Sequence, residues 1–255
     1  MPALVRDAQL AQYLLRLGDN ALVLGQRLSE WTGHAPVVEE DLALTNVALD
    51  LIGQARLWLS YAAEAEGSGR DEDRLAYFRD SRDYRNVLLV ELPNGDYGAT
   101  LARQFLFDTW HFHLLGALGD SNDERLAGIA HKAVREVAYH VRRSGDWMLR
   151  LGDGTEFSHA KMQAAVDDLW PYTGELFRSD QIDVEMCERG AGPSLESLRG
   201  PWLEHVRRVL TAATLSVPPD GWMHSGGKSG RHTEHLGYLL AEMQSVRRSV
   251  PGDRW

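Results

Sequence analysis

One carboxylate and one imidazole of this sequence lie where a bundle of helices would bind metal. A bundle that holds two irons needs a Glu from each of two helices and a Glu-x-x-His pair from each of the other two, because two hard cations require several bridging oxygens and an imidazole each. The corresponding inward positions here carry Leu51, Gln54, Asp108, Val137 and His140. Asp108 and His140 alone cannot hold two divalent ions, so we expect a vestigial site with no bound metal and no catalytic residue.

Buried polar side chains of this kind need other partners. An unpaired buried carboxylate costs several kcal/mol or takes up a proton, so Asp108 requires a partner, and His140 across the bundle is one candidate. Asp19 and Asn20 are polar residues inside an otherwise apolar helix. We expect them to form a hydrogen bond between helices.

The elements that position these residues are predicted from the apolar spacing. Apolar residues recur every three or four positions, which indicates helices rather than strands. The predicted helices cover about residues 9–31, 38–66, 73–78, 82–91, 97–118, 123–152, 158–177 with a kink at Pro171, 200–215 and 233–249, with Asp96 and Asn122 as N-caps. The connection of nearly thirty residues after Gly67 suits the long crossover of a four-helix bundle. We therefore predict an all-α, ferritin-like four-helix bundle core with additional C-terminal helices.

Composition limits the classes of function. The chain of 255 residues has no Gly/Ser-rich or Pro-rich linker, which predicts a single ferritin-like helical domain over residues 1–255. The formal charge of -10 disfavours nucleic acid as a partner. One cysteine, Cys187, excludes an intramolecular disulfide, and no apolar stretch is long enough to span a membrane. We expect a cytoplasmic protein that binds neither nucleic acid nor membrane.

Ordered blocks of polar and apolar residues run through nearly the whole chain, from about Tyr13 to Trp255. They include Leu17-Gly18-Asp19-Asn20, Leu24-Gly25-Gln26-Arg27-Leu28, Gly33-His34-Ala35-Pro36, Asp50-Leu51-Ile52-Gly53-Gln54-Ala55-Arg56 and His232-Thr233-Glu234-His235-Leu236-Gly237. In these blocks the sequence resembles the PaaC family, the structural subunits of the bacterial monooxygenase that epoxidises the ring of phenylacetyl-CoA.

The resemblance also accounts for the missing ligands. The catalytic subunit of that complex is a ferritin-like paralogue whose second-helix motif, Asp-Glu-Ala-Gly-His, has Leu51 and Gln54 here in place of its Glu and His. In its fourth-helix motif, Glu-Glu-x-x-His, Val137 replaces the second Glu and His140 is retained. Asp108 matches the third-helix carboxylate. The resemblance implies that iron is bound by the partner and not by this chain.

The resemblance further implies a function and partners. It implies a non-catalytic subunit in aerobic phenylacetate catabolism that stabilises the di-iron catalytic subunit. The other implied partners are further subunits of the complex and a separate reductase with NADPH, FAD and an iron-sulfur centre. For the substrate, phenylacetyl-CoA, the predicted contacts are Arg82, Asp83, Tyr84, Arg85 and Asn86 in the long connection, and Val184, Glu185 and Met186.

Alternatives to each of these hypotheses remain open at the level of sequence. Arg82 and Arg85 are also expected to pair with Asp80 and Asp83 on a solvated turn if the segment binds no substrate. The chain as a whole could be an independent ferritin-like metalloenzyme, for which Glu136, His111 and His140 are the best candidate ligands. It could also be a helical binding module without an enzyme partner.

Overall fold

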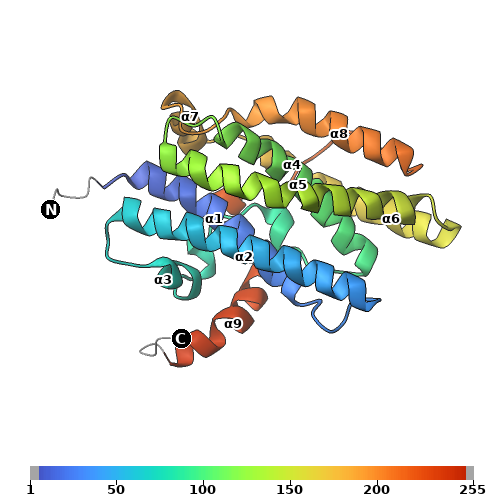
Figure 1. The fold of residues 1–255 in the computed structure, drawn as a ribbon, viewed down its shortest axis with the longest axis horizontal. Coiled ribbons are helices and arrows are strands. Elements are labelled where there is room, and N and C mark those ends of the chain that lie inside the picture. Colours follow the sequence, from blue (N-terminus) through green and yellow to red (C-terminus); the bar gives the residue numbers. More distant parts are fainter. Residues whose placement is uncertain (1–5, 251–255) are drawn as a thin grey trace. The chain divides into compact units, whose positions relative to one another are not determined.

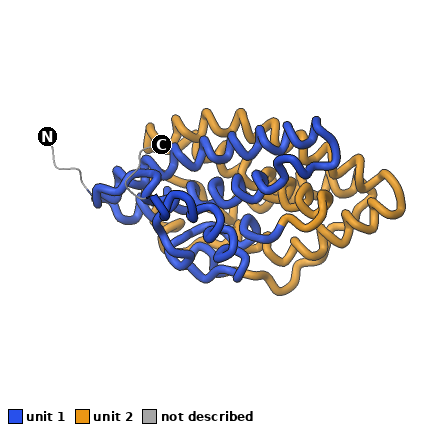
Figure 2. Tube along the Cα trace, turned by 90° about the horizontal axis from the view of Figure 1, so that it is seen from below, with its two compact units in different colours: residues 1–93, 226–255 blue, residues 94–225 orange. Residues whose placement is uncertain are grey.

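The computed structural model describes residues 6–250, and within that range the secondary structure is helical without strands. The all-α prediction is thus confirmed. The chain divides into two compact units, residues 6–93 with 226–250 and residues 94–225 (Figure 2). The single domain over residues 1–255 stays a prediction. No helix within residues 6–250 is both long and apolar enough to cross a membrane.

The first unit is built on a hairpin of two long helices (Figure 1). Its elements are α1 (Ala8–Ser29), α2 (Val38–Glu66), α3 (Glu72–Tyr77), the 3-10 turns η1 (Ser81–Asp83), η2 (Leu88–Glu91) and η6 (Gly227–Ser229), and α9 (Glu234–Ser249). Gly18 and Gly25 lie where α1 meets α2. A Cβ atom at Gly18 would lie 2.7 Å from Leu59 Cδ2, and one at Gly25 would lie 3.1 Å from Ile52 Cγ1. Glycine at these two positions therefore lets the helices approach closely.

The connection between α2 and the second unit is held by buried polar side chains of α1. Asp19 accepts two hydrogen bonds from the Arg79 guanidinium, one of them 2.9 Å long, and Asn20 Oδ1 accepts one from the Val87 amide at 2.8 Å. Asp19 and Asn20 thus bind the connection, and the expected bond between helices is a wrong prediction. Residues 82–91 were also expected to be helical, but they form η1, an extended stretch and η2. The backbone of that stretch bonds to α1 side chains, which replaces helical hydrogen bonds.

The C-terminal helix α9 begins at a hydrogen-bonded junction with η2. The Glu91 carboxylate, fully buried, accepts from His232 Nδ1 at 2.7 Å, from the Thr233 amide at 2.6 Å and from Asn86 Nδ2 at 2.8 Å. His232 Nε2 lies 3.0 Å from the carbonyl oxygen of Tyr84. These bonds fix the start of α9, close to the predicted start at residue 233.

The second unit is built on another pair of long helices. Its elements are α4 (Tyr97–Leu118), α5 (Glu124–Gly152), α6 (Glu156–Leu169), η3 (Trp170–Tyr172), η4 (Gly174–Phe177), α7 (Gln181–Glu188), η5 (Leu195–Leu198) and α8 (Arg199–Ala212). Helix α4 packs along α5, and both α6 and α8 contact this pair. Buried Trp202 of α8 donates a hydrogen bond of 3.0 Å to the Leu106 carbonyl of α4.

Three details of the second unit differ from the sequence prediction. Asp123, not Asn122, caps α5, since its carboxylate accepts from the amides of Arg125 and Leu126. Helix α6 ends at Leu169, and the chain continues through η3, which contains Pro171. Helix α7 was not predicted. Its apolar residues Ile182, Val184 and Met186 alternate in twos, so the segment lacks the spacing by which helices are recognised.

Candidate functional site

The Asp108 carboxylate is fully buried on α4 and bound by two neutral side chains. Gln104 Nε2, one turn earlier on the same helix, donates to Asp108 Oδ1 at 2.6 Å. The Ser144 hydroxyl of α5 donates to Asp108 Oδ2 at 3.1 Å. We name Gln104, Asp108, Ser144 and His140 the α4–α5 polar cluster. Gln104 and Ser144 are hydrogen-bond partners of Asp108, and the predicted partner His140 also acts on its charge.

The cluster compensates the negative charge of Asp108 only in part. Burial raises the pKa of Asp108 to about 6, although the His140 imidazole and the hydrogen bonds from Gln104 and Ser144 act in the opposite direction. The carboxylate is therefore mostly ionised at neutral pH and takes up a proton in mildly acidic solution.

Two buried imidazoles flank this carboxylate, and neither forms a ligand set with it. His140 is buried on α5, one turn before Ser144, whose hydroxyl also lies 2.8 Å from the His140 carbonyl oxygen. His111 is buried on α4. Burial, together with the charge of His140, lowers the pKa of His111 to about 3, so its imidazole is neutral at physiological pH.

The donor set of the second unit does not fit a di-iron centre. Val137 is fully buried on α5 and offers no donor atom, and Glu136 beside it is half-buried. Within residues 6–250, no group of three or more His, Cys, Asp or Glu side chains is arranged to hold a metal ion. Two bridged cations need several such ligands. We therefore derive no chemistry through iron in this chain.

The other predicted positions of the vestigial site lie on α2, in the first unit. Leu51 is fully buried, and Gln54 is 2% exposed. Leu51 packs beside Gly25 of α1, where a Cβ atom on the glycine would lie 3.4 Å from Leu51 Cβ. Leu51 thus serves the packing of the α1–α2 hairpin.

In the long connection, two of the five predicted substrate contacts are fully buried and hydrogen-bonded within their own unit. Tyr84 and Asn86 are fully buried. The Tyr84 hydroxyl donates to the Ala76 carbonyl and accepts from Gln244 Nε2 at 3.1 Å, while Asn86 Nδ2 bonds to Glu91. These side chains hold the connection in place, and contact between them and a substrate stays a prediction.

The remaining residues of the connection differ in how their charges are used. The half-buried Arg85 guanidinium donates to the carbonyl oxygens of Arg82 and Tyr84, at 2.8 and 2.7 Å, and burial lowers its pKa. Asp80 instead pairs with Arg248 at 3.2 Å, so the predicted pairing of Arg82 and Arg85 with neighbouring aspartates does not form. Asp83 and Arg82 are exposed, and in the described part of the chain the Arg82 guanidinium donates no hydrogen bond. Arg82 is thus the cation of this segment most accessible to a ligand.

The second predicted contact segment lies on α7, in the other unit. Val184 is 47% exposed, whereas Met186 is fully buried. The Glu185 carboxylate pairs with Arg189, one turn further along the helix. The role of Val184, Glu185 and Met186 in binding a substrate stays a prediction.

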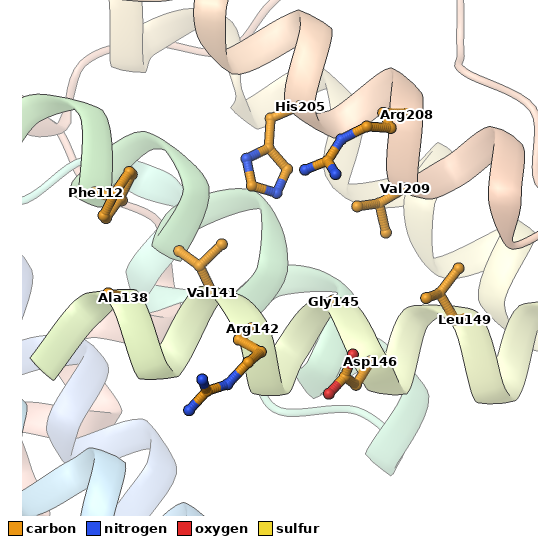
Figure 3. Close-up of a pocket in the computed structure, with 10 residues that line it drawn as sticks. All are labelled: Phe112, Ala138, Val141, Arg142, Gly145, Asp146, Leu149, His205, Arg208 and Val209. Carbon is orange, nitrogen blue, oxygen red and sulfur yellow. The ribbon is translucent and has the colours of Figure 1, made fainter.

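The second unit also contains a cavity of about 390 Å³ between α4, α5 and α8 (Figure 3). Its apolar lining includes Phe112, Val141 and Val209, while His205 and Arg208 from α8 lie at its upper side in the view. Burial lowers the pKa of His205, and the positive charge of Arg208 adds to this effect. None of the predicted site residues lines this cavity.

Comparison with known proteins decides the family. The sequence matches the family described as phenylacetic acid catabolic protein over residues 2–255. The chain belongs to this family. It is 52% identical over 247 residues to the C subunit of 1,2-phenylacetyl-CoA epoxidase from Escherichia coli (strain K12), covering 97% of this chain and 99% of that protein. The family predicted by resemblance, and with it the ferritin-like helical fold, is confirmed.

Sequence reasoning missed the residues that complete the α4–α5 polar cluster of this family member. Gln104 lies four residues before Asp108, and Ser144 lies four residues after His140. Positions four apart share one face of a helix, so this spacing was the available signal. Gln and Ser do not occur in the metal-ligand motifs of di-iron bundles, so a prediction based on those motifs does not include Gln104 and Ser144.

Proposed function

We propose that this chain is the non-catalytic structural subunit of a multicomponent di-iron monooxygenase that epoxidises the ring of phenylacetyl-CoA in aerobic phenylacetate catabolism. The chain stabilises the ferritin-like catalytic subunit, which binds the two irons and supplies the oxygen chemistry. Its other partners are further subunits of the complex and a reductase with NADPH, FAD and an iron-sulfur centre. It works in the cytoplasm.

The observation that carries this proposal is the 52% identity to an epoxidase C subunit, and the surroundings of Asp108 support a non-catalytic role. Within residues 6–250 no group of three or more His, Cys, Asp or Glu side chains is arranged to hold a metal ion, and the Asp108 oxygens accept hydrogen bonds from Gln104 and Ser144. The neighbouring Val137 is apolar and buried. The chain is thus highly identical to an epoxidase subunit, and in its α4–α5 pair hydrogen bonds and packing take the place of metal ligands. Together these observations support a non-catalytic subunit.

The exposed Arg82 supports a minor role in substrate binding. Coenzyme A carries phosphate groups, and a guanidinium is well suited to bind them. Arg82 is exposed and donates no hydrogen bond within residues 6–250, so its charge is accessible to such a group. Arg85 supports the same backbone turn through its bond to the Arg82 carbonyl oxygen.

Elemental analysis of the chain expressed alone and coexpressed with the di-iron subunit tests the proposal. We expect no stoichiometric iron or manganese in the chain alone, and two irons per catalytic chain in the copurified complex. The catalytic subunit expressed alone is the control, and we expect it to be less stable or less soluble than in the complex.

Two other outcomes would each overturn the proposal. Two metal ions per chain in the protein expressed alone would identify an independent metalloenzyme. Failure of the two subunits to copurify, with both chains folded by circular dichroism, would leave a binding module without this enzyme partner.

A further inference from the structure

Helix α2 carries apolar residues on its outer surface as well as on its buried side. Val38, Leu42 and Leu49 are 72%, 59% and 60% exposed, although Leu44, Val47 and Leu51 of the same helix are fully or almost fully buried. A helix of a soluble protein that is apolar on both sides is expected to be covered on both sides. The exposed residues of α2 therefore indicate a surface that another chain covers.

The spacing of the exposed residues is that of a helix-packing seam. Val38, Leu42, Thr45, Leu49 and Gly53 follow one another at intervals of four, three, four and four residues. We name these five residues the outer face of α2. Alternating intervals of four and three place side chains along one line of a helix and match the seam between two helices that cross at a shallow angle. The occupant of this face is thus expected to be a helix.

Gly53 continues the outer face at its C-terminal end and leaves room there for a close neighbour. Glycine inside a helix is unfavourable relative to alanine, so an exposed glycine needs a reason. A Cβ atom at Gly53 would have no atom within 4 Å, whereas Cβ atoms at Gly18 and Gly25 would crowd α2. Packing within the chain explains the glycines of α1 but not Gly53. Because Gly53 follows Val38, Leu42 and Leu49 along the same apolar line, it would let the backbone of a helix docked on that line approach closely.

The charges beside the outer face indicate which charge the side chains of a docking helix should carry. Residues 38–50 contain Glu39, Glu40, Asp41 and Asp50 but no Lys or Arg. Two copies of this helix packed on each other would place these acidic borders together, which is unfavourable. A helix with an apolar stripe bordered by basic side chains would complement both the seam and the charge.

We propose that the outer face of α2 is the docking surface for a helix of the di-iron catalytic subunit, and that this helix has an apolar stripe bordered by Lys or Arg. The inference rests on the proposed function, because that function supplies the partner. It adds the site at which the partner is held: Leu42 and Leu49 insert between its side chains, and Gly53 allows its backbone to approach.

The test measures association of the two subunits with substitutions on the outer face. Leu49→Arg introduces a charge at the centre of the seam, and Gly53→Leu fills the space left for the partner. We expect each to raise the Kd for the catalytic subunit at least about tenfold, as measured by biolayer interferometry. Gly53→Leu should keep or increase the thermal stability of the chain alone, because leucine is a better helix former than glycine.

Matched control variants are available on α9. Val246 is 63% exposed, and a Cβ atom at Gly237 would also have no atom within 4 Å. Val246→Arg and Gly237→Leu therefore repeat the two chemical changes on another exposed helix surface. We expect both to bind the catalytic subunit as the wild-type chain does.

The outcomes separate this inference from the proposed function. If the wild-type chain binds the catalytic subunit and both α2 variants bind equally well, the docking surface is elsewhere and the proposed function stands. If the wild-type chain does not bind that subunit, both fail. If the chain alone forms a dimer that Leu49→Arg dissociates in analytical ultracentrifugation, a second copy covers the face and the proposed occupant is wrong.

Discussion

Two buried aspartates, one in each unit, are stabilised in different ways. Asp19 accepts two hydrogen bonds from the buried Arg79 guanidinium and a third, at 2.8 Å, from the Arg85 amide. Burial by itself would lower the pKa of Arg79, but the charge of Asp19 raises it above its usual value. Asp108 accepts hydrogen bonds from the amide of Gln104 and the hydroxyl of Ser144, and burial raises its pKa although the charges of His140 and Arg143 act in the opposite direction.

The Asp19–Arg79 contact is therefore a structural ion pair, whereas the surroundings of Asp108 compensate the cost of burying its negative charge only in part. The Asp19–Arg79 pair joins α1 to the connection that follows α2, so each charge neutralises the other at a point where the chain must be fixed. Asp108 occupies a position that carries a metal ligand in the catalytic paralogue, as the family resemblance implies. Its hydrogen-bond donors are neutral, and the nearby charges of His140 and Arg143 offset the cost of burial only in part.

The strongest test of this comparison removes the carboxylate of the ion pair. Asp19→Ala leaves the Arg79 charge buried without its partner, and we expect a loss of about 3–5 kcal/mol in the free energy of unfolding, measured by urea denaturation. Asp19→Ala combined with Arg79→Met should restore part of that loss, since it removes the isolated charge. Equal stability of the single variant and the wild-type chain would contradict a structural ion pair.

The second test uses pH, because Asp108 is predicted to take up a proton in mild acid. A folded-state pKa of about 6, above the ordinary value of 3.8, gives a stabilising contribution that is complete below about pH 4 and is lost as the pH rises through 6. Relative to Asp108→Asn, the wild-type chain should lose about 3 kcal/mol of stability between pH 4 and pH 7. Parallel stability curves for the two proteins across this range would show that Asp108 is ionised normally.

Asp108→Ala should have a smaller effect at neutral pH. It leaves the Gln104 amide without its acceptor, which costs about 1–3 kcal/mol, while Ser144 keeps the His140 carbonyl oxygen, and it also removes a poorly compensated charge. Urea denaturation should therefore show a modest net loss, and elemental analysis of the purified complex should show unchanged iron. Loss of iron in proportion to the variant chain would identify Asp108 as a ligand.

The smallest expected effect concerns the exposed charge near the ion pair. Arg82→Ala should raise the apparent KM of the complex for phenylacetyl-CoA about 2- to 5-fold, since one exposed contact to a phosphate is worth about 1 kcal/mol or less. Assembly should be unaffected, as size-exclusion chromatography would show. Arg207→Ala, an exposed arginine of α8, is the control and should leave KM unchanged. An unchanged KM in Arg82→Ala would remove the connection from substrate binding.

The sequence by itself determined the helical framework and the family. The bounds of α2 and α4 follow from apolar spacing and local signals such as the Asp96 cap, because a helix is formed by interactions within one or two turns. The sequence also predicted that most ligands of a di-iron site are missing, since Leu51, Gln54 and Val137 stand at positions where such a site needs Glu or His. Local spacing failed in two places. The α7 segment is helical although its apolar residues lack helical spacing, and residues 82–91 have helical spacing but do not form one continuous helix.

Only the tertiary structure decided which partners the buried polar groups have. Asp19 meets Arg79 sixty residues away, and Asp108 on α4 meets Ser144 on α5. Each polar group could be satisfied by several others of suitable chemistry, and the choice depends on which side chains the packing brings within about 3 Å. The same reason applies to Tyr84 and Asn86, whose hydrogen bonds to Ala76 and Glu91 depend on how the connection packs.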